Sequence, residues 1–181
     1  FLVRSFYIPS PSMQHTLEVQ DRIMVNQLVP GLVPVQRGDI VVFRDPGGWL
    51  QSPPSVNTAP PGPFEQLLQT VGLAADTSND YLVKRVIGIG GDRVACCDAN
   101  GRVTVNGVPL NEPYIVIPPG QRKASKDDFE VTVPEGSVWV MGDNRYNSLD
   151  SRYHQDQPGK GFVSNDEIVG RAFLLNWPLD R

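Results

Sequence analysis

Two serines and one lysine are the residues of this sequence best suited to peptide-bond chemistry. Ser10 and Ser12 lie in the run IPSPSM at residues 8–13. Each proline fixes its own φ at about −65° and favours extended geometry in the residue before it. A stiff segment of this kind can hold a hydroxyl in one direction. A serine hydroxyl is a weak nucleophile, so it also needs a base within hydrogen-bond distance.

Lys84 is the better candidate for that base. Histidine is the usual choice, but the sequence contains only His15 and His154, and His15 is close to Ser12 in the sequence alone. Lys84 interrupts the apolar strand pattern YLVKRVIG at residues 81–88. An amine surrounded by apolar side chains loses its proton more easily than an amine in water. The sequence therefore predicts a Ser/Lys pair.

A third polar segment follows the apolar run VWVM at residues 138–141. Residues 142–152, GDNRYNSLDSR, hold two acids, two arginines, two asparagines and two serines. Side chains of these types bond readily to nearby backbone groups. We therefore expect a rigid, hydrogen-bonded loop rather than a linker.

Taken together and in this order, these segments resemble bacterial type I signal peptidases, the membrane-tethered Ser/Lys proteases that remove signal peptides from exported proteins. The matching motifs are Ser-x-Ser-Met with Thr16-Leu17, RGDIVVF at 37–43, KRVIG at 84–88 with Gly91-Asp92, and the loop 142–152. His15 and Tyr146 depart from the proline and the small polar residue that are usual in the family.

The resemblance implies a role for each motif residue. Ser12 is expected to be the nucleophile and Lys84 the general base, with the oxyanion held by the Ser12 N–H and the Ser10 hydroxyl. Ser148 matches the serine that orients the lysine. The charged residues of the loop are expected to be structural: Asp143, Arg145, Asp150 and Arg152. Pockets for small, alanine-like side chains are expected at Phe6, Ile8, Pro9, Met13, Leu17, Val42 and Val83.

The composition predicts a mainly β fold. The chain has 181 residues, with 17 prolines and 17 glycines scattered among short Val/Ile-rich runs, a pattern typical of strands separated by turns. Strands are expected near 22–26 and 40–43, a hairpin turn at Asn106-Gly107, and a mobile polar loop at 120–128. The resemblance implies a large antiparallel β-sheet catalytic core and a smaller β lobe.

The expected division of the chain follows these patterns. Residues 1–45, 80–95 and 138–181 would form the catalytic core, and 96–137 the smaller lobe. Residues 46–79 read as a Pro/Gly-rich insertion. Within it an apolar stripe at i, i+3, i+4 and i+7 predicts a short amphipathic helix, packed on the sheet or touching a membrane or partner. The stripe consists of Phe64, Leu67, Leu68 and Val71.

Charge and hydropathy limit the partners. The net charge of −4 and the absence of a basic run give no reason to expect nucleic acid. Two histidines and no clustered ligands predict no metal, and the glycines at 88–91 lack the spacing of a dinucleotide motif, so no cofactor is expected. No run approaches the roughly 20 apolar residues that span a bilayer. The expected partners are signal peptides and the membrane surface, with an anchor upstream and the catalytic domain on the extracytoplasmic side of the cytoplasmic membrane.

Three alternatives remain open at this point. Cys96 and Cys97 are adjacent and can be two ordinary small side chains or a vicinal disulfide. Self-cleaving repressor domains of the DNA-damage response share a Ser/Lys pair, but they should lack the segment 142–152 and carry a DNA-binding region. A non-catalytic β-rich interaction domain is the third alternative, although it would need no lysine inside an apolar strand.

Overall fold

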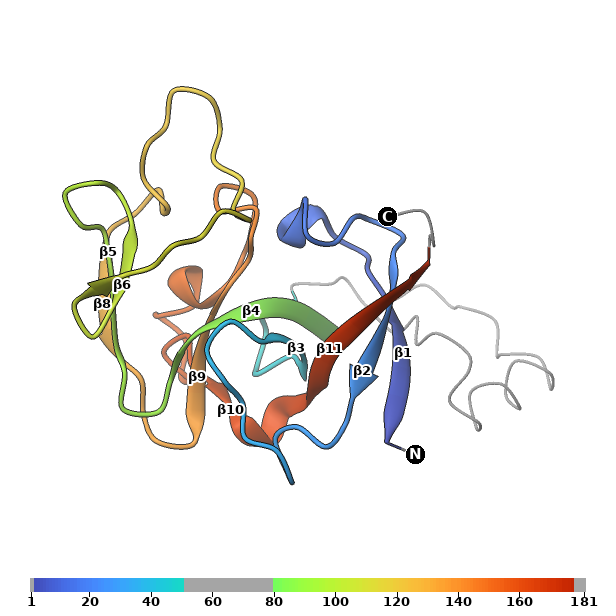
Figure 1. The fold of residues 1–181 in the computed structure, drawn as a ribbon. Coiled ribbons are helices and arrows are strands. Elements are labelled where there is room, and N and C mark those ends of the chain that lie inside the picture. The colour runs from blue at the N-terminus through green and yellow to red at the C-terminus, as the bar shows by residue number, and fades with distance from the viewer. Residues whose placement is uncertain (1, 51–79, 178–181) are drawn as a thin grey trace.

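The computed structural model describes residues 2–50 and 80–177, and its strands form two antiparallel sheets. In Figure 1 the smaller sheet stands at one side of the molecule, and the strands nearest the chain ends stand at the other. The prediction of a mainly β fold is confirmed. The amphipathic helix expected around Phe64–Val71 lies outside the described residues.

The larger sheet has seven strands and carries the site. In spatial order these are β1 (Val3–Tyr7), β2 (Arg22–Asn26), β11 (Ile168–Trp177), β3 (Ile40–Arg44), β4 (Tyr81–Ile89), β9 (Ser137–Met141) and β10 (Val163–Ser164). Strands β2 and β3 are consecutive in this sequence, yet β11 lies between them and pairs with both. The last long strand of the chain therefore joins the N-terminal strands to β3, the neighbour of the strand that holds Lys84.

The smaller sheet has four strands in the order β7 (Val108–Pro109), β6 (Val103–Val105), β5 (Arg93–Cys96) and β8 (Phe129–Thr132). Asn106 and Gly107 link β6 to β7 with φ values of 53° and 80°. Positive φ at both central residues is what a two-residue type I′ turn requires. The predicted hairpin turn is confirmed.

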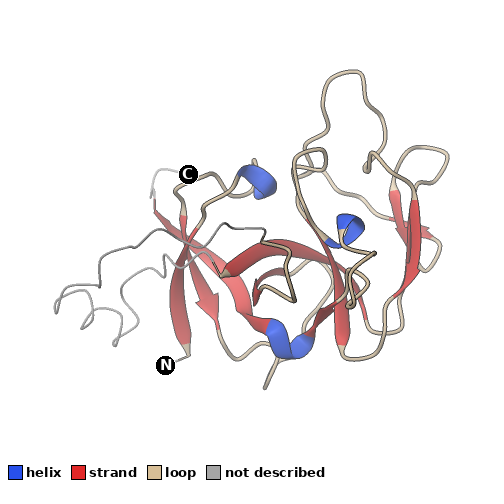
Figure 2. Ribbon diagram, turned by 180° about the vertical axis from the view of Figure 1, so that it is seen from behind, coloured by secondary structure: helices blue, strands red, loops and turns tan. Residues whose placement is uncertain are grey.

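Helical structure in the described residues consists of three short 3₁₀ turns, η1 (Pro11–Met13), η2 (Ser151–Tyr153) and η3 (Asn165–Glu167) (Figure 2). Within 2–50 and 80–177, none of these is long and apolar enough to cross a membrane. The turns η1 and η2 both belong to polar motifs that the sequence singles out. Their shortness is consistent with the prolines and the small polar residues in these segments.

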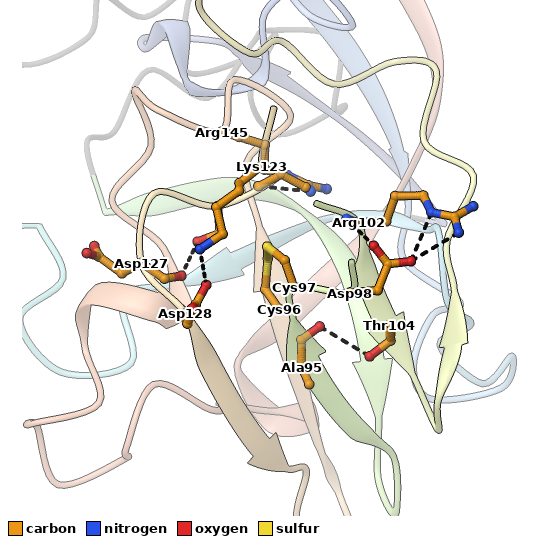
Figure 3. The surroundings of a disulfide bond; sticks show 12 residues. Ala95, Cys96, Cys97, Asp98, Arg102, Thr104, Lys123, Asp127, Asp128 and Arg145 are labelled. Atoms are coloured by element: carbon orange, nitrogen blue, oxygen red, sulfur yellow. Dashed lines mark hydrogen bonds and ion pairs between the residues drawn. A yellow bond between two sulfur atoms is a disulfide. The ribbon is translucent and has the colours of Figure 1, made fainter. Parts of the chain in front are cut away.

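Cys96 and Cys97 are joined by a disulfide at the end of β5 (Figure 3). The ion pair between Arg102 and Asp98 lies beside it, and Thr104 donates a hydrogen bond to the Ala95 carbonyl. Of the two possibilities that the sequence leaves open for the cysteines, the structure has the bonded one.

Candidate active site

Ser12 lies in the 3₁₀ turn η1, and its side chain is buried to 7% exposure. Ser10 precedes the turn in extended geometry, with φ −130° and ψ 154°, as expected for a residue before proline. The loop after β9 holds the turn from outside. The Asn144 N–H donates to the Ser12 carbonyl at 3.0 Å, and the Asn144 side-chain amide donates to the Pro11 carbonyl at 3.2 Å.

Lys84 reaches Ser12 from the middle of β4, between the neighbouring strands β3 and β9. Its Nζ donates to Ser12 Oγ at 2.7 Å and to the Val83 carbonyl at 3.1 Å. The side chain is only 4% exposed. Burial lowers the pKa of Lys84 from 10.5 to about 8, against the opposing charges of Asp150 and Asp143. About one-tenth of the amine is then neutral at pH 7.

The other two serines predicted for the site lie beside this pair. Ser10 Oγ is 3.1 Å from Ser12 Oγ. Ser148 Oγ donates to an Asp150 carboxylate oxygen at 2.8 Å, and Ser148 lines the same cavity as Lys84. Gly142 leaves room for Ser148 and for the turn that carries Ser12. A Cβ at position 142 would clash with both Ser148 Oγ and the Ser12 carbonyl oxygen.

Asp150 is the centre of the hydrogen-bond network in the loop. Its carboxylate accepts bonds from Ser148, from the Gly142 N–H at 2.9 Å and from the Arg152 guanidinium at 2.7 and 2.8 Å. Burial raises the pKa of Asp150, but these donors, Arg152 above all, outweigh it and leave the pKa below its ordinary value. Asp150 therefore stays ionised although it is fully buried.

The other two charged residues of the loop find their partners elsewhere in the chain. Asp143, fully buried, accepts two hydrogen bonds from Arg85 at 2.8 and 2.7 Å and one from Thr16. Arg145, also fully buried, forms a bidentate pair with Glu112 at 3.0 and 2.6 Å. These contacts tie the loop to β4, to the segment after η1 and to the segment after β7.

Two cavities meet at the Ser12–Lys84 pair. The smaller, of about 70 Å³, is lined mainly by apolar side chains, including Ile8, Met13 and Val83. The larger, of about 460 Å³, shares Ser10, Ser12 and Lys84 with it.

Four of the seven residues predicted to bind substrate, Ile8, Pro9, Met13 and Val83, line the smaller cavity. The other three, Phe6, Leu17 and Val42, are buried in the same hydrophobic cluster as Ile8, Met13 and Val83.

Comparisons with known proteins point to one family. The family model described as "Signal peptidase, peptidase S26" matches residues 1–177. A signal peptidase I of Mycobacterium tuberculosis is 41% identical over 200 residues, covering 100% of this chain and 67% of that protein. A signal peptidase I of Leptolyngbya laminosa is 36% identical over 181 residues, covering 100% of this chain and 72% of that protein.

The chain belongs to the signal peptidase family, peptidase S26. The sequence-based prediction of a serine peptidase of this family is confirmed, and the repressor and interaction-domain alternatives are set aside. Among solved structures, a signal peptidase I from Enterococcus faecalis is 26% identical, with a TM-score of 0.47, covering 76% of this chain and 95% of that chain. Signal peptidases act on preproteins that carry signal peptides.

Sequence reasoning missed three residues that hold this site. Arg85 was included in the motif KRVIG without a role of its own, yet its guanidinium is the main partner of Asp143 and stacks on the Tyr114 ring at 3.8 Å. Glu112, the partner of Arg145, lies in a stretch with no recognisable motif. Ser125 accepts a hydrogen bond from Arg152. The two arginines of the loop were the available signal, but the sequence does not say which distant residues bond to them.

Proposed function

We propose that this chain hydrolyses the bond between a signal peptide and the exported protein, with Ser12 as nucleophile and Lys84 as general base. The observation that carries the proposal is the 2.7 Å contact between Lys84 Nζ and Ser12 Oγ inside a buried environment. As an ammonium, Lys84 donates to Ser12. Once it has lost one proton, its lone pair accepts the Ser12 proton along the same contact.

The chemistry takes two steps. Ser12 Oγ bonds to the scissile carbonyl carbon as its proton passes to Lys84; the C–N bond then breaks, and the departing amine takes that proton from Lys84. In the second step a water attacks the ester and gives a proton to Lys84, and Ser12 leaves with its proton restored. The oxyanion in both steps is held by the Ser12 N–H and the Ser10 hydroxyl.

We assign Ser148 the role of orienting Lys84. Its proton is donated to Asp150, so its oxygen lone pairs remain free to accept a hydrogen bond from the lysine. Asp150, Arg152, Asp143 and Arg145 act as structural residues that fix the loop.

Specificity for small residues follows from the smaller cavity. A space of about 70 Å³ lined by Ile8, Met13 and Val83 accepts a methyl group but not an aromatic ring. An extended substrate segment lying along this edge would place alternate side chains toward it. We propose cleavage after small, alanine-like residues, on the extracytoplasmic side of the cytoplasmic membrane and next to the membrane surface.

The test uses the purified chain and a fluorogenic peptide copied from a signal-peptide junction with alanine before the cut. Ser12→Ala and Lys84→Met should each lower kcat by about 10²–10⁴-fold or more, because nucleophile and base act as one unit. The double variant should have a kcat little lower than that of either single variant. Lys160→Met, at an exposed lysine, is the matched control. Near-native turnover by Lys84→Met in a folded protein would falsify the dyad.

A further inference from the structure

The larger cavity extends from the Ser12–Lys84 pair to a part of the surface that the proposed mechanism does not use. It has a volume of about 460 Å³. Beyond the residues it shares with the smaller cavity, its walls come from Pro11 and Trp49, from the loop after β9 and from Lys126. Lys126 belongs to the segment that leads into β8.

The order of the two cavities determines which part of a substrate occupies each. If the residue before the cut fills the small apolar cavity, the scissile bond lies at Ser12. The chain after the cut must then leave on the other side of the pair, through the larger cavity. The first residues of the exported protein would therefore pass Lys126.

Charge in this cavity is all of one sign. Within the described part of the chain its lining contains no aspartate or glutamate, and its charged residues are Lys84 and Lys126. Lys84 is buried and bonded to Ser12. Lys126 is exposed and has no ion-pair partner among the described residues, whereas nearby Lys123 pairs with Asp128. The Asp127 carboxylate lies close to Tyr153 and does not line the cavity.

The backbone around Lys126 is held in place by the network of the catalytic loop. Ser125 is fully buried; its Oγ donates to the Asp127 carbonyl at 2.7 Å and accepts from Arg152 at 3.1 Å. Ala124, at 3% exposure, is buried beside it. The loop expected from the sequence at 120–128 is present, but at these residues it is fixed by buried contacts that its polar composition does not reveal.

We propose that Lys126 is a specificity-determining residue that favours substrates with aspartate or glutamate among the first three residues after the cut. The inference rests on the proposed function, because it takes Ser12 as the point of attack. An exposed ion pair of this kind is worth about a two- to fivefold change in kcat/KM. Because the charges are solvated, the preference should shrink as salt is added.

The experiment compares matched peptides that share one signal-peptide junction and carry Asp, Asn or Lys at the first, second or third position after the cut. Wild type is measured against Lys126→Glu and Lys126→Arg, with Lys160→Glu as the charge-matched control at a lysine outside the cavity. Thermal unfolding of each variant checks that the fold persists. The Asn peptide reports the basal activity.

Wild type should cleave the best Asp peptide about two- to fivefold faster than its Asn partner, and the Lys peptide more slowly. Lys126→Glu should invert the order, while Lys126→Arg and Lys160→Glu keep it. An unchanged Asp/Lys ratio in Lys126→Glu, with normal cleavage of the Asn peptide, overturns this inference and leaves the proposed function intact. Failure of wild type to cleave the Asn peptide overturns the proposed function and this inference with it.

Discussion

At the scale of the residue, Lys84 is an amine with little water around it and few partners. Its side chain is 4% exposed, and its hydrogen bonds go to Ser12 Oγ and to one backbone carbonyl. Burial lowers its pKa to about 8, while Asp150 and Asp143 act in the opposite direction. The balance keeps the amine available as a base near neutral pH without removing its ability to carry a proton to the leaving group.

The pH profile of the peptidase should report this balance. Because only neutral Lys84 accepts the Ser12 proton, kcat/KM should rise about tenfold per pH unit below pH 8 and level off above it. The measurement is peptide hydrolysis from pH 6 to 10, with Lys160→Met as a control that should keep the same midpoint. A midpoint near 10.5, the ordinary pKa of lysine, would contradict the assignment.

The same pKa has a consequence for stability. Between about pH 8 and 10.5 the unfolded chain binds more protons at Lys84 than the folded chain does. Lys84 therefore increases the free energy of unfolding as the pH rises through this window. Lys84→Met should remove this increase. The measurement is the free energy of unfolding by denaturant at pH 7 and pH 10, in wild type and in the variant.

At the scale of the element, the loop after β9 is held on one side by the segment between β7 and β8. Val116 bridges Asn144 in parallel fashion, with its N–H donating to the Asp143 carbonyl at 2.8 Å and its carbonyl accepting from the Arg145 N–H at 3.1 Å. The buried pair between Glu112 and Arg145 locks the same junction. Since Asn144 in turn donates a hydrogen bond to the Ser12 carbonyl, the segment between β7 and β8 helps to hold the turn that carries Ser12.

Glu112→Gln should destabilise the chain strongly, because it leaves Arg145 buried without its carboxylate. Breaking one side of a buried pair costs about 3–5 kcal/mol, which at this chain length lowers the melting temperature by about 6–20 °C. The double variant Glu112→Leu/Arg145→Met should lose less stability than Glu112→Gln, because it leaves no buried charge without a partner.

The control for this prediction is Glu130→Gln, since Glu130 forms an exposed ion pair with Arg93. This change should lower the free energy of unfolding by no more than about 1 kcal/mol. Thermal unfolding of the four proteins is the measurement. If Glu112→Gln were no more harmful than Glu130→Gln, the buried pair would not be what holds the loop.

At the scale of the whole molecule, the two sheets share one hydrophobic cluster. Trp139, from β9 of the larger sheet, is fully buried and packs against Phe129 of β8 and against Phe162, with ring centroids 5.3 and 5.5 Å apart. Ile87 joins the same cluster from β4, as does Val94 from β5. Neither sheet can be separated from the other without exposing these side chains to water.

Unfolding should therefore be a single transition for both sheets. Trp139→Ala should lower the free energy of unfolding by about 3–5 kcal/mol, through lost transfer energy and the cavity it leaves. Calorimetry and far-UV circular dichroism should report coincident transitions for wild type and variant. Leu32→Ala, at 82% exposure, should change stability by less than about 0.5 kcal/mol. Two separate transitions in wild type would show that the sheets unfold independently.

The sequence alone was sufficient for features that depend on local geometry and on short motifs. The alternation of apolar residues indicated the strands, and Asn106-Gly107 indicated its turn because few other pairs adopt two positive φ values. Ser12 and Lys84 could be singled out since a proline-flanked serine and a lysine inside an apolar run are unusual in themselves. The family motifs supplied the roles expected for these two residues.

Only the tertiary structure decided which distant residues meet. β11 lies between two strands that are neighbours in the sequence, and Arg145 takes Glu112 as its partner. Lys126 stands at the cavity wall because buried Ser125 fixes its loop. No local pattern encodes these choices, since each depends on how the backbone brings segments from separate parts of the chain together. The motifs of the candidate site are present in the sequence, and tertiary packing decided which distant residues support it.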